Sequence, residues 1–159
     1  MSAPPGPAMN RRVRRWLAVT FVLASLGTAA ELLLLEHTER AVQWAPLALI
    51  AAALLVLAWH AAAPSRASVR AFQAAMILFA AAGAVGATLH YRGNVEFEKE
   101  MHPDAGAWTL FRGAMMGATP ALAPGTMVLL GSIGLLFAYR HPAASGPGAG
   151  EPSPKEDSR

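Results

Sequence analysis

Four apolar runs of about 20 residues each constrain this chain of 159 residues more than any other feature. They cover residues 16–35, 41–62, 69–91 and 119–139. An α-helix rises about 1.5 Å per residue, so each run is long enough to cross a hydrocarbon core of roughly 30 Å. The runs are continuously apolar rather than alternating, which favours helices over barrel strands. The sequence therefore predicts an all-α integral membrane protein, with a four-transmembrane-helix bundle within residues 16–141.

Composition supports a membrane protein. Hydrophobic residues make up 54% of the chain and charged residues 14%, and the mean hydropathy is +0.35; soluble domains carry about 25% charged residues. The chain has no cysteine, which excludes a disulfide scaffold and a CxxC zinc or redox site. It also lacks a Walker loop and a GxSxG motif, so we expect no enzymatic activity. The aromatic residues at the ends of the runs fit the membrane–water interface: Trp16, Trp44, Trp59, Tyr91 and Tyr139.

The distribution of Lys and Arg predicts the topology. One side of the predicted bundle carries nine of them and the other side carries four, namely Arg40, Arg92, Lys99 and Arg112. The positive-inside rule then places both termini in the cytoplasm of a bacterium, with the chain in the inner membrane. The excess of arginine over lysine and the abundant alanine fit a GC-rich bacterial genome. Four arginines precede the first run, and we expect them to set topology and contact anionic lipid rather than nucleic acid: Arg11, Arg12, Arg14 and Arg15.

The segments outside the runs differ in character. Residues 1–15 and 142–159 are basic or of low complexity, and we expect them to be disordered. The arginines followed by an apolar stretch also resemble a signal peptide cleaved after Ala30, but the apolar run continues beyond that point, which favours an uncleaved anchor. The outer loop 92–118 is acidic in its first half. In its second half, Trp108, Phe111 and Met115 at helical spacing predict a short interfacial helix, with an apolar loop packed on the bundle as the alternative.

Small residues recur at helical spacing in three of the runs. Such stripes let membrane helices approach closely, so they predict either a compact bundle or a homodimer face. The stripe in the first run includes Glu31, which is thereby predicted to point inward. The stripes comprise Thr20, Ala24, Gly27, Thr28 and Glu31 in the first run, Gly83, Gly86 and His90 in the third, and Gly125, Gly131 and Gly134 in the fourth.

Two groups of residues are candidates for chemistry. Glu31 and His90 are candidates for a proton or ion site, because an ionisable group inside a span is costly and usually faces the bundle. The outer-face histidines and carboxylates are candidates for a zinc or copper site, although their spacing matches no defined motif and a solvated acidic rim explains them as well. This second group comprises Glu36, His37, Glu39, His90 and His102.

Histidines at the run ends also raise a haem alternative. His37 and His90 lie at one side of the predicted bundle and His60 and His141 at the other. Paired axial histidines hold membrane b-type haems, but at the helix ends a haem would be poorly shielded, so no cofactor is expected.

These patterns favour a non-enzymatic accessory or assembly protein that contacts another membrane protein or a second copy of itself. The alternatives are a small proton- or cation-coupled transporter using Glu31 and His90, and an outer-face metal-binding protein.

Overall fold

The computed structural model describes residues 7–36, 41–117 and 123–144. Every regular element in these residues is helical, so the all-α prediction is confirmed. The elements in chain order are α1 (Pro7–Leu34), η1 (Ala41–Gln43), α2 (Trp44–Ala62), α3 (Arg66–Met101), α4 (Ala107–Met115), α5 (Gly125–Ala138) and η2 (Pro142–Ala144).

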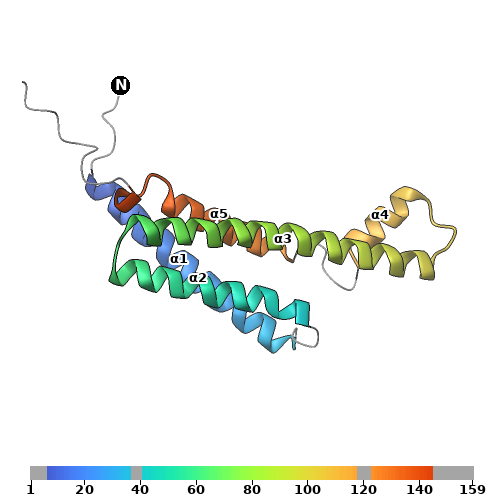
Figure 1. Cartoon of the computed structure of the whole chain (residues 1–159). Helices are drawn as coiled ribbons and strands as arrows, with labels where there is room; N and C mark the ends of the chain where they lie inside the picture. The colour runs from blue at the N-terminus through green and yellow to red at the C-terminus, as the bar shows by residue number, and fades with distance from the viewer. Residues whose placement is uncertain (1–6, 37–40, 118–122, 145–159) are drawn as a thin grey trace, which may run out of the picture.

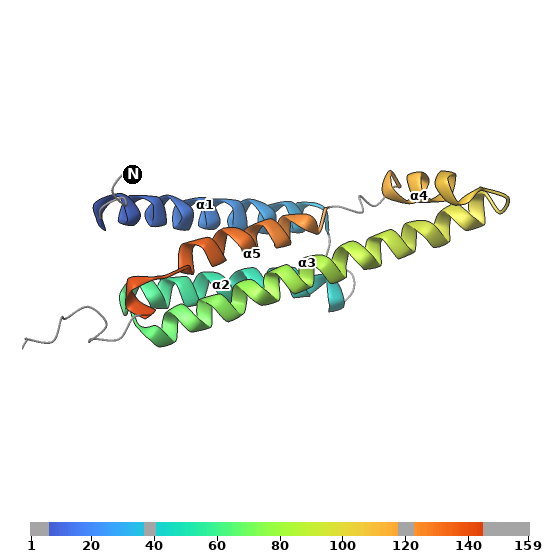
Figure 2. The ribbon, with the colours of Figure 1, turned by 90° about the horizontal axis from the view of Figure 1, so that it is seen from above.

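The helices form an elongated bundle with one projecting end. Helix α5 packs on both α1 and α3 and lies between them in Figure 2, while α2 packs on α3 and α1. The start of α1, the connection from α2 to α3 and the end of α5 meet at one end, which we call the basic end because it carries Arg11, Arg12, Arg14, Arg15, Arg66 and Arg70. Helix α3 runs past the other end and pairs with α4 (Figure 1). We call residues 90–117 the outer hairpin, after the outer loop that the sequence predicts there.

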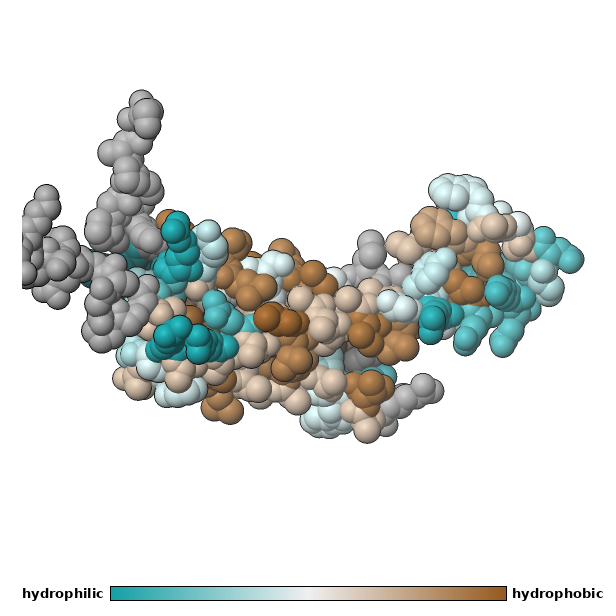
Figure 3. Space-filling model, turned by 45° about the horizontal axis from the view of Figure 1, so that its top comes forward, coloured by the Kyte–Doolittle hydropathy of each residue, from teal (hydrophilic) through white to brown (hydrophobic). Residues whose placement is uncertain are grey.

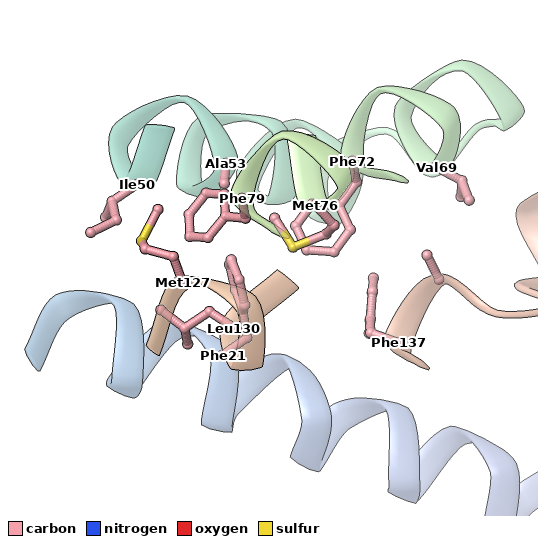
Figure 4. Packing of buried hydrophobic residues seen from close by; sticks show 11 residues of the cluster. Phe21, Ile50, Ala53, Val69, Phe72, Met76, Phe79, Met127, Leu130 and Phe137 are labelled. Carbon is pink, nitrogen blue, oxygen red and sulfur yellow. The ribbon is translucent and has the colours of Figure 1, made fainter. Parts of the chain in front are cut away.

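Aromatic rings from three helices meet in the buried core (Figure 4). Phe21 of α1 contacts Phe72 of α3 edge-on, with ring centroids 5.4 Å apart. Phe72 in turn contacts Phe137 of α5 at 5.5 Å, also edge-on. Edge-to-face pairs add to the stabilisation from burial. These rings therefore tie α1, α3 and α5 together near the basic end.

Glycines allow α3 and α5 to approach closely. A Cβ atom added to Gly131 would lie 2.7 Å from the backbone oxygen of Met76, and one added to Gly83 would lie 2.8 Å from the backbone oxygen of Pro124. The small residues of the third and fourth runs thus form a contact within one chain, as expected for close membrane-helix packing.

The predicted small-residue face of α1 is wrong at three of its five positions, whereas Ala24 packs against the core and Thr28 is half-buried. Thr20, Gly27 and Glu31 are exposed, and a Cβ added to Gly27 would meet nothing within 4 Å. The buried side of α1 instead carries Phe21 and Ser25, both fully buried. The reason is that the Phe21 ring fills the space against the aromatic rings of α3, and burying a large ring stabilises packing more than close approach of small residues does.

Within the described residues, three helical segments are long and apolar enough to span a membrane: Arg11–Leu34, Ala41–Ala62 and Arg66–Met101. Their large apolar side chains mostly face outward, and Leu55 in the middle of α2 is 71% exposed. Figure 3 shows hydrophobic residues over the middle of the bundle and hydrophilic ones towards both ends. This distribution is the one expected of a protein whose outer surface contacts lipid.

The fourth apolar helix is shorter than predicted. Helix α5 has 14 residues and reaches about 21 Å. It begins after Pro124, which delays the helix because proline cannot donate a backbone hydrogen bond. Residues 119–122 of the predicted span lie outside the described residues.

Three predicted boundaries need correction. Helix α1 begins at Pro7 and η2 covers Pro142–Ala144, so residues 7–15 and 142–144 are helical rather than disordered. Residues 1–6 and 145–159 lie outside the described residues. Helix α3 continues to Met101, so the outer loop predicted at 92–118 is largely two helices. The acidic segment after Tyr91 stays helical because it is rich in Glu and Lys, which are good helix formers, and because α4 packs against it.

Candidate functional sites at the two ends of the bundle

At the basic end, Arg14 joins α1 to the end of α5. Its Nη1 donates a hydrogen bond to Phe137 O, and its Nη2 donates to Tyr139 O at 2.8 Å and to Arg140 O at 2.9 Å. The last carbonyls of a helix have no partner within the helix and carry partial negative charge. The planar guanidinium, with several donors in one plane, satisfies Phe137 O of the last turn of α5 together with the two carbonyl oxygens that follow the helix.

Beside Arg14, His60 joins α2 to the start of α3. Its Nδ1 lies 2.8 Å from Ser68 Oγ in a buried hydrogen bond. Ser68 also completes a capping box with Ser65: the Ser65 side chain accepts from Ser68 N–H at 3.1 Å, and the Ser68 side chain accepts from Ser65 N–H at 3.0 Å. The sequence Ser-Arg-Ala-Ser therefore both begins α3 and holds the imidazole.

His141 completes this cluster. Arg140 has a φ of 46°, a left-handed conformation that turns the chain after α5. His141 then lies against His60, with ring centroids 4.6 Å apart and planes nearly perpendicular, and its Nδ1 accepts a hydrogen bond from Ala143 N–H at 3.2 Å. We call Arg14, His60, Ser68 and His141 the basic-end cluster; it connects α1, α2, α3 and α5.

The basic-end cluster is arranged as a structural junction. Each Nδ1 is engaged in a hydrogen bond, which fixes the orientation of its ring. The two imidazole rings are in direct contact, with centroids 4.6 Å apart, which leaves no room for a haem plane between them. The haem alternative is therefore not supported for His60 and His141. The hydrogen bonds and ring contacts of the basic-end cluster hold the ends of α1, α2, α3 and α5 together.

The pKa of His141 gives a testable pH dependence. Burial, then the nearby His60 and then the Arg14 guanidinium lower this pKa from 6.5 to about 4. The folded state holds the His141 imidazole neutral. Its contribution to the free energy of unfolding is therefore complete above pH 6.5, where the imidazole is neutral in the unfolded chain as well. This contribution is lost as the pH falls from 6.5 towards 4, since His141 then takes up a proton only in the unfolded chain.

We expect the detergent-solubilised protein to lose about 1–2 kcal/mol of stability through His141 over this pH interval. This is about half of what the full pKa shift corresponds to, since the ring is partly exposed to solvent. The measurement is thermal unfolding between pH 7 and pH 4 for the parent and for His141→Gln, with His102→Gln as the control because His102 is exposed in the outer hairpin. Equal pH dependence in the parent and His141→Gln would contradict the expectation.

At the other end, the outer hairpin is held together by polar and glycine contacts. Asn94 of α3 is buried, and its Nδ2 donates to Ala114 O of α4 at 2.8 Å. A Cβ added to Gly117 would lie 2.8 Å from Asn94 Cγ, and one added to Gly113 would lie 2.7 Å from Glu98 Cδ. The α4 backbone therefore lies directly on the side chains of α3.

A row of aromatic rings runs along the outer hairpin. Trp108 stacks on Phe111 with centroids 5.6 Å apart, and Phe111 lies 6.2 Å from Tyr91 of α3. Trp108 is 73% exposed despite this stacking. The predicted helical spacing of Trp108, Phe111 and Met115 is confirmed by α4, whereas the location of this helix in the membrane interface stays a prediction.

The predicted ion-site residues do not come together. Glu31 is exposed on α1, contrary to the predicted inward orientation, and its side chain makes no hydrogen bond or ion pair within the described part of the chain. His90 is half-buried on α3 and does have an interaction. Helix α5 packs between these two helices in Figure 2. An ion path through both residues is therefore not supported by their positions.

The predicted metal ligands are dispersed. His37 and Glu39 lie outside the described residues. Glu36 is exposed at the end of α1, and His90 and His102 are twelve positions apart along α3, which corresponds to about 18 Å. Among the residues that the structure describes, no three His, Asp or Glu side chains are placed to hold a metal ion.

The four arginines before the first run have different environments. Arg14 is turned into the bundle, whereas Arg11, Arg12 and Arg15 are exposed. Sequence reasoning missed the basic-end cluster, although it placed His60 and His141 at the same side of the bundle. The spacing along α1 could have indicated that Arg14 faces the bundle. Arg14 lies seven residues before the buried Phe21 and eleven before the buried Ser25, and positions separated by such sums of 3- and 4-residue steps share one helix face.

Comparison with known proteins gives no relative: the chain matches no family model, no curated protein and no solved structure.

Proposed function

We propose that this chain is a non-enzymatic accessory protein of a bacterial inner membrane. Helices α1, α2, α3 and α5 anchor it, both termini face the cytoplasm, and the outer hairpin contacts a partner membrane protein on the opposite side. The observation that carries this proposal is the projection of α3. At 36 residues it reaches about 54 Å, well beyond a hydrocarbon core of roughly 30 Å.

The surface of the outer hairpin supports a contact role. Within the hydrocarbon core, an exposed apolar side chain contacts lipid, which is favourable. Outside the core the same side chain contacts water, so a patch of large apolar side chains there indicates a contact with another molecule. The outer hairpin nevertheless exposes Trp108 and Met116, each 73% exposed, and Phe97, which is 54% exposed. Exposed aromatic residues on a rigid element are the type of residue that dominates binding energy at protein interfaces.

The rigidity of the outer hairpin also supports this role. The bond from Asn94 to Ala114 O and the contact of Phe111 with Tyr91 hold α4 in one position on α3. A preformed surface binds without the entropic cost of ordering a loop.

The charge distribution fits the proposed topology, because seven arginines gather at the basic end: Arg11, Arg12, Arg14, Arg15, Arg66, Arg70 and Arg140.

Site-specific photocrosslinking in native membranes tests the proposal. A photoreactive amino acid replaces Trp108 in one variant and Leu55 in the other, and these positions are almost equally exposed, at 73% and 71%. We expect a reproducible adduct with a larger protein from position 108 and no protein adduct from position 55, which faces outward from the middle of α2. Recovery of only the uncrosslinked chain from the variant at position 108 would contradict the proposed partner. An adduct of twice the chain's mass would show a second copy of this chain in place of a different membrane protein.

A further inference from the structure

A hollow of about 310 Å³ lies on the outward side of α1 at the basic end. It is lined by Arg12, Arg15, Trp16 and Val19. Successive residues of an α-helix are about 100° apart around its axis, so these four positions share one face. Arg14 lies roughly on the opposite side of the helix, where it binds the end of α5.

The two arginines of the hollow are available to a ligand. Both Arg12 and Arg15 are exposed, and within the described residues neither has a hydrogen-bond or ion-pair partner. This contrasts with Arg14, whose guanidinium is committed to three carbonyl oxygens. Two guanidinium groups one helical turn apart are suited to a single phosphate group, because each can donate paired hydrogen bonds to its oxygens.

The rest of the hollow is apolar and leads along the bundle. Trp16 and Val19 lie one turn further into α1, and the same face continues with Leu23, which is 65% exposed, and Leu26, which is 51% exposed. Tryptophan is favoured at the level of lipid headgroups. The face thus presents cations at the helix start and then a continuous apolar track along the span.

We propose that this hollow binds one anionic phospholipid, with its phosphate between Arg12 and Arg15 and an acyl chain along Val19 and Leu23. A free phosphate ion would use the guanidinium groups but gain nothing from the apolar track. A zwitterionic lipid carries a cation in its headgroup, which the two arginines repel. An anionic headgroup combined with acyl chains matches both parts of the surface.

Binding of phosphatidylglycerol to the full-length protein tests this proposal. The protein is purified in mild detergent, and bound lipid is measured by native mass spectrometry during titration with phosphatidylglycerol or phosphatidylcholine. The variant Arg12→Gln/Arg15→Gln is compared with Arg11→Gln/Arg66→Gln, which removes the same charge from exposed positions outside the hollow. We expect about a tenfold loss of phosphatidylglycerol affinity in the first variant and less than about a threefold loss in the control.

Two outcomes would overturn the proposal. Equal losses in both variants would show diffuse attraction to the basic end rather than a site. Displacement of phosphatidylglycerol by millimolar inorganic phosphate, together with unchanged lipid affinity in Trp16→Ala, would show a phosphate site that does not recognise lipid. Unchanged thermal unfolding of the Arg12→Gln/Arg15→Gln variant in phosphatidylcholine, expected because both side chains are exposed, would confirm that the loss of binding does not reflect misfolding.

Discussion

Gly131→Ala should destabilise the bundle by about 1–3 kcal/mol, and Gly131→Ile should separate α5 from α3 altogether. A Cβ at position 131 would lie 2.7 Å from Met76 O and 3.1 Å from the backbone nitrogen of Ala80. Both neighbours are backbone atoms in the middle of a long helix, so they cannot move aside as a flexible side chain can. The helices themselves must part, which removes contacts along their length.

Gly27 provides a matched control with the opposite sign. It lies within α1, is exposed, and has no atom within 4 Å of where its Cβ would lie. Gly27→Ala should therefore stabilise the protein by about 0.5–1 kcal/mol, because alanine restricts the unfolded chain and favours the helix. Thermal unfolding in detergent measures both variants. Shifts of the same sign at positions 27 and 131 would contradict the close contact between α3 and α5.

The apolar runs predict the helices well because hydropathy over 20 residues is a property of composition and needs no tertiary information. Helices α1, α2, α3 and α5 all arise from the predicted runs. The errors lie at the helix ends, and the largest is at the end of α3. Residues 92–101 are mostly polar, so hydropathy ends at Tyr91, yet the chain remains helical because these residues have helix propensity and Asn94 bonds to α4. Hydropathy thus reports the hydrocarbon core rather than the length of the helix.

The packing faces show why a site is harder to predict than a span. The stripes on α3 and α5 were recognised because glycine is the residue that close approach requires. On α1, Thr20 and Gly27 face outward and Phe21 faces the core, because the aromatic rings of Phe72 and Phe79 offer a better contact. Such a preference depends on which helix is the neighbour, and the pattern within one apolar run does not show which helix that is. The basic-end cluster was missed for the same reason, since it joins residues more than 120 positions apart.

Arg14→Met should lower the stability of the bundle by about 2–3 kcal/mol and loosen the end of α5. The substitution keeps an apolar stem of similar length but removes the donors to Phe137 O, Tyr139 O and Arg140 O. Hydrogen bonds from a charged donor contribute about 1.5–3 kcal/mol each, and these three share one group, so their effects do not add in full. Arg14→Lys should give an intermediate loss, because an ammonium group lacks the planar fork of donors.

Arg11→Met is the control for Arg14→Met, since it removes the same charge from the same helix at an exposed position. It should change the free energy of unfolding by less than about 0.5 kcal/mol, the usual effect of a surface substitution.

Hydrogen exchange measures the local effect of Arg14→Met. Backbone amides of the last turn of α5 and of η2 should exchange faster, while those of the outer hairpin should exchange at unchanged rates. Because His141 lies beside Arg14 and its lowered pKa depends partly on that charge, Arg14→Met should also raise the pKa of His141 towards its ordinary value. Equal effects of the Arg11 and Arg14 substitutions would show that net charge, rather than the three carbonyl contacts, stabilises the basic end.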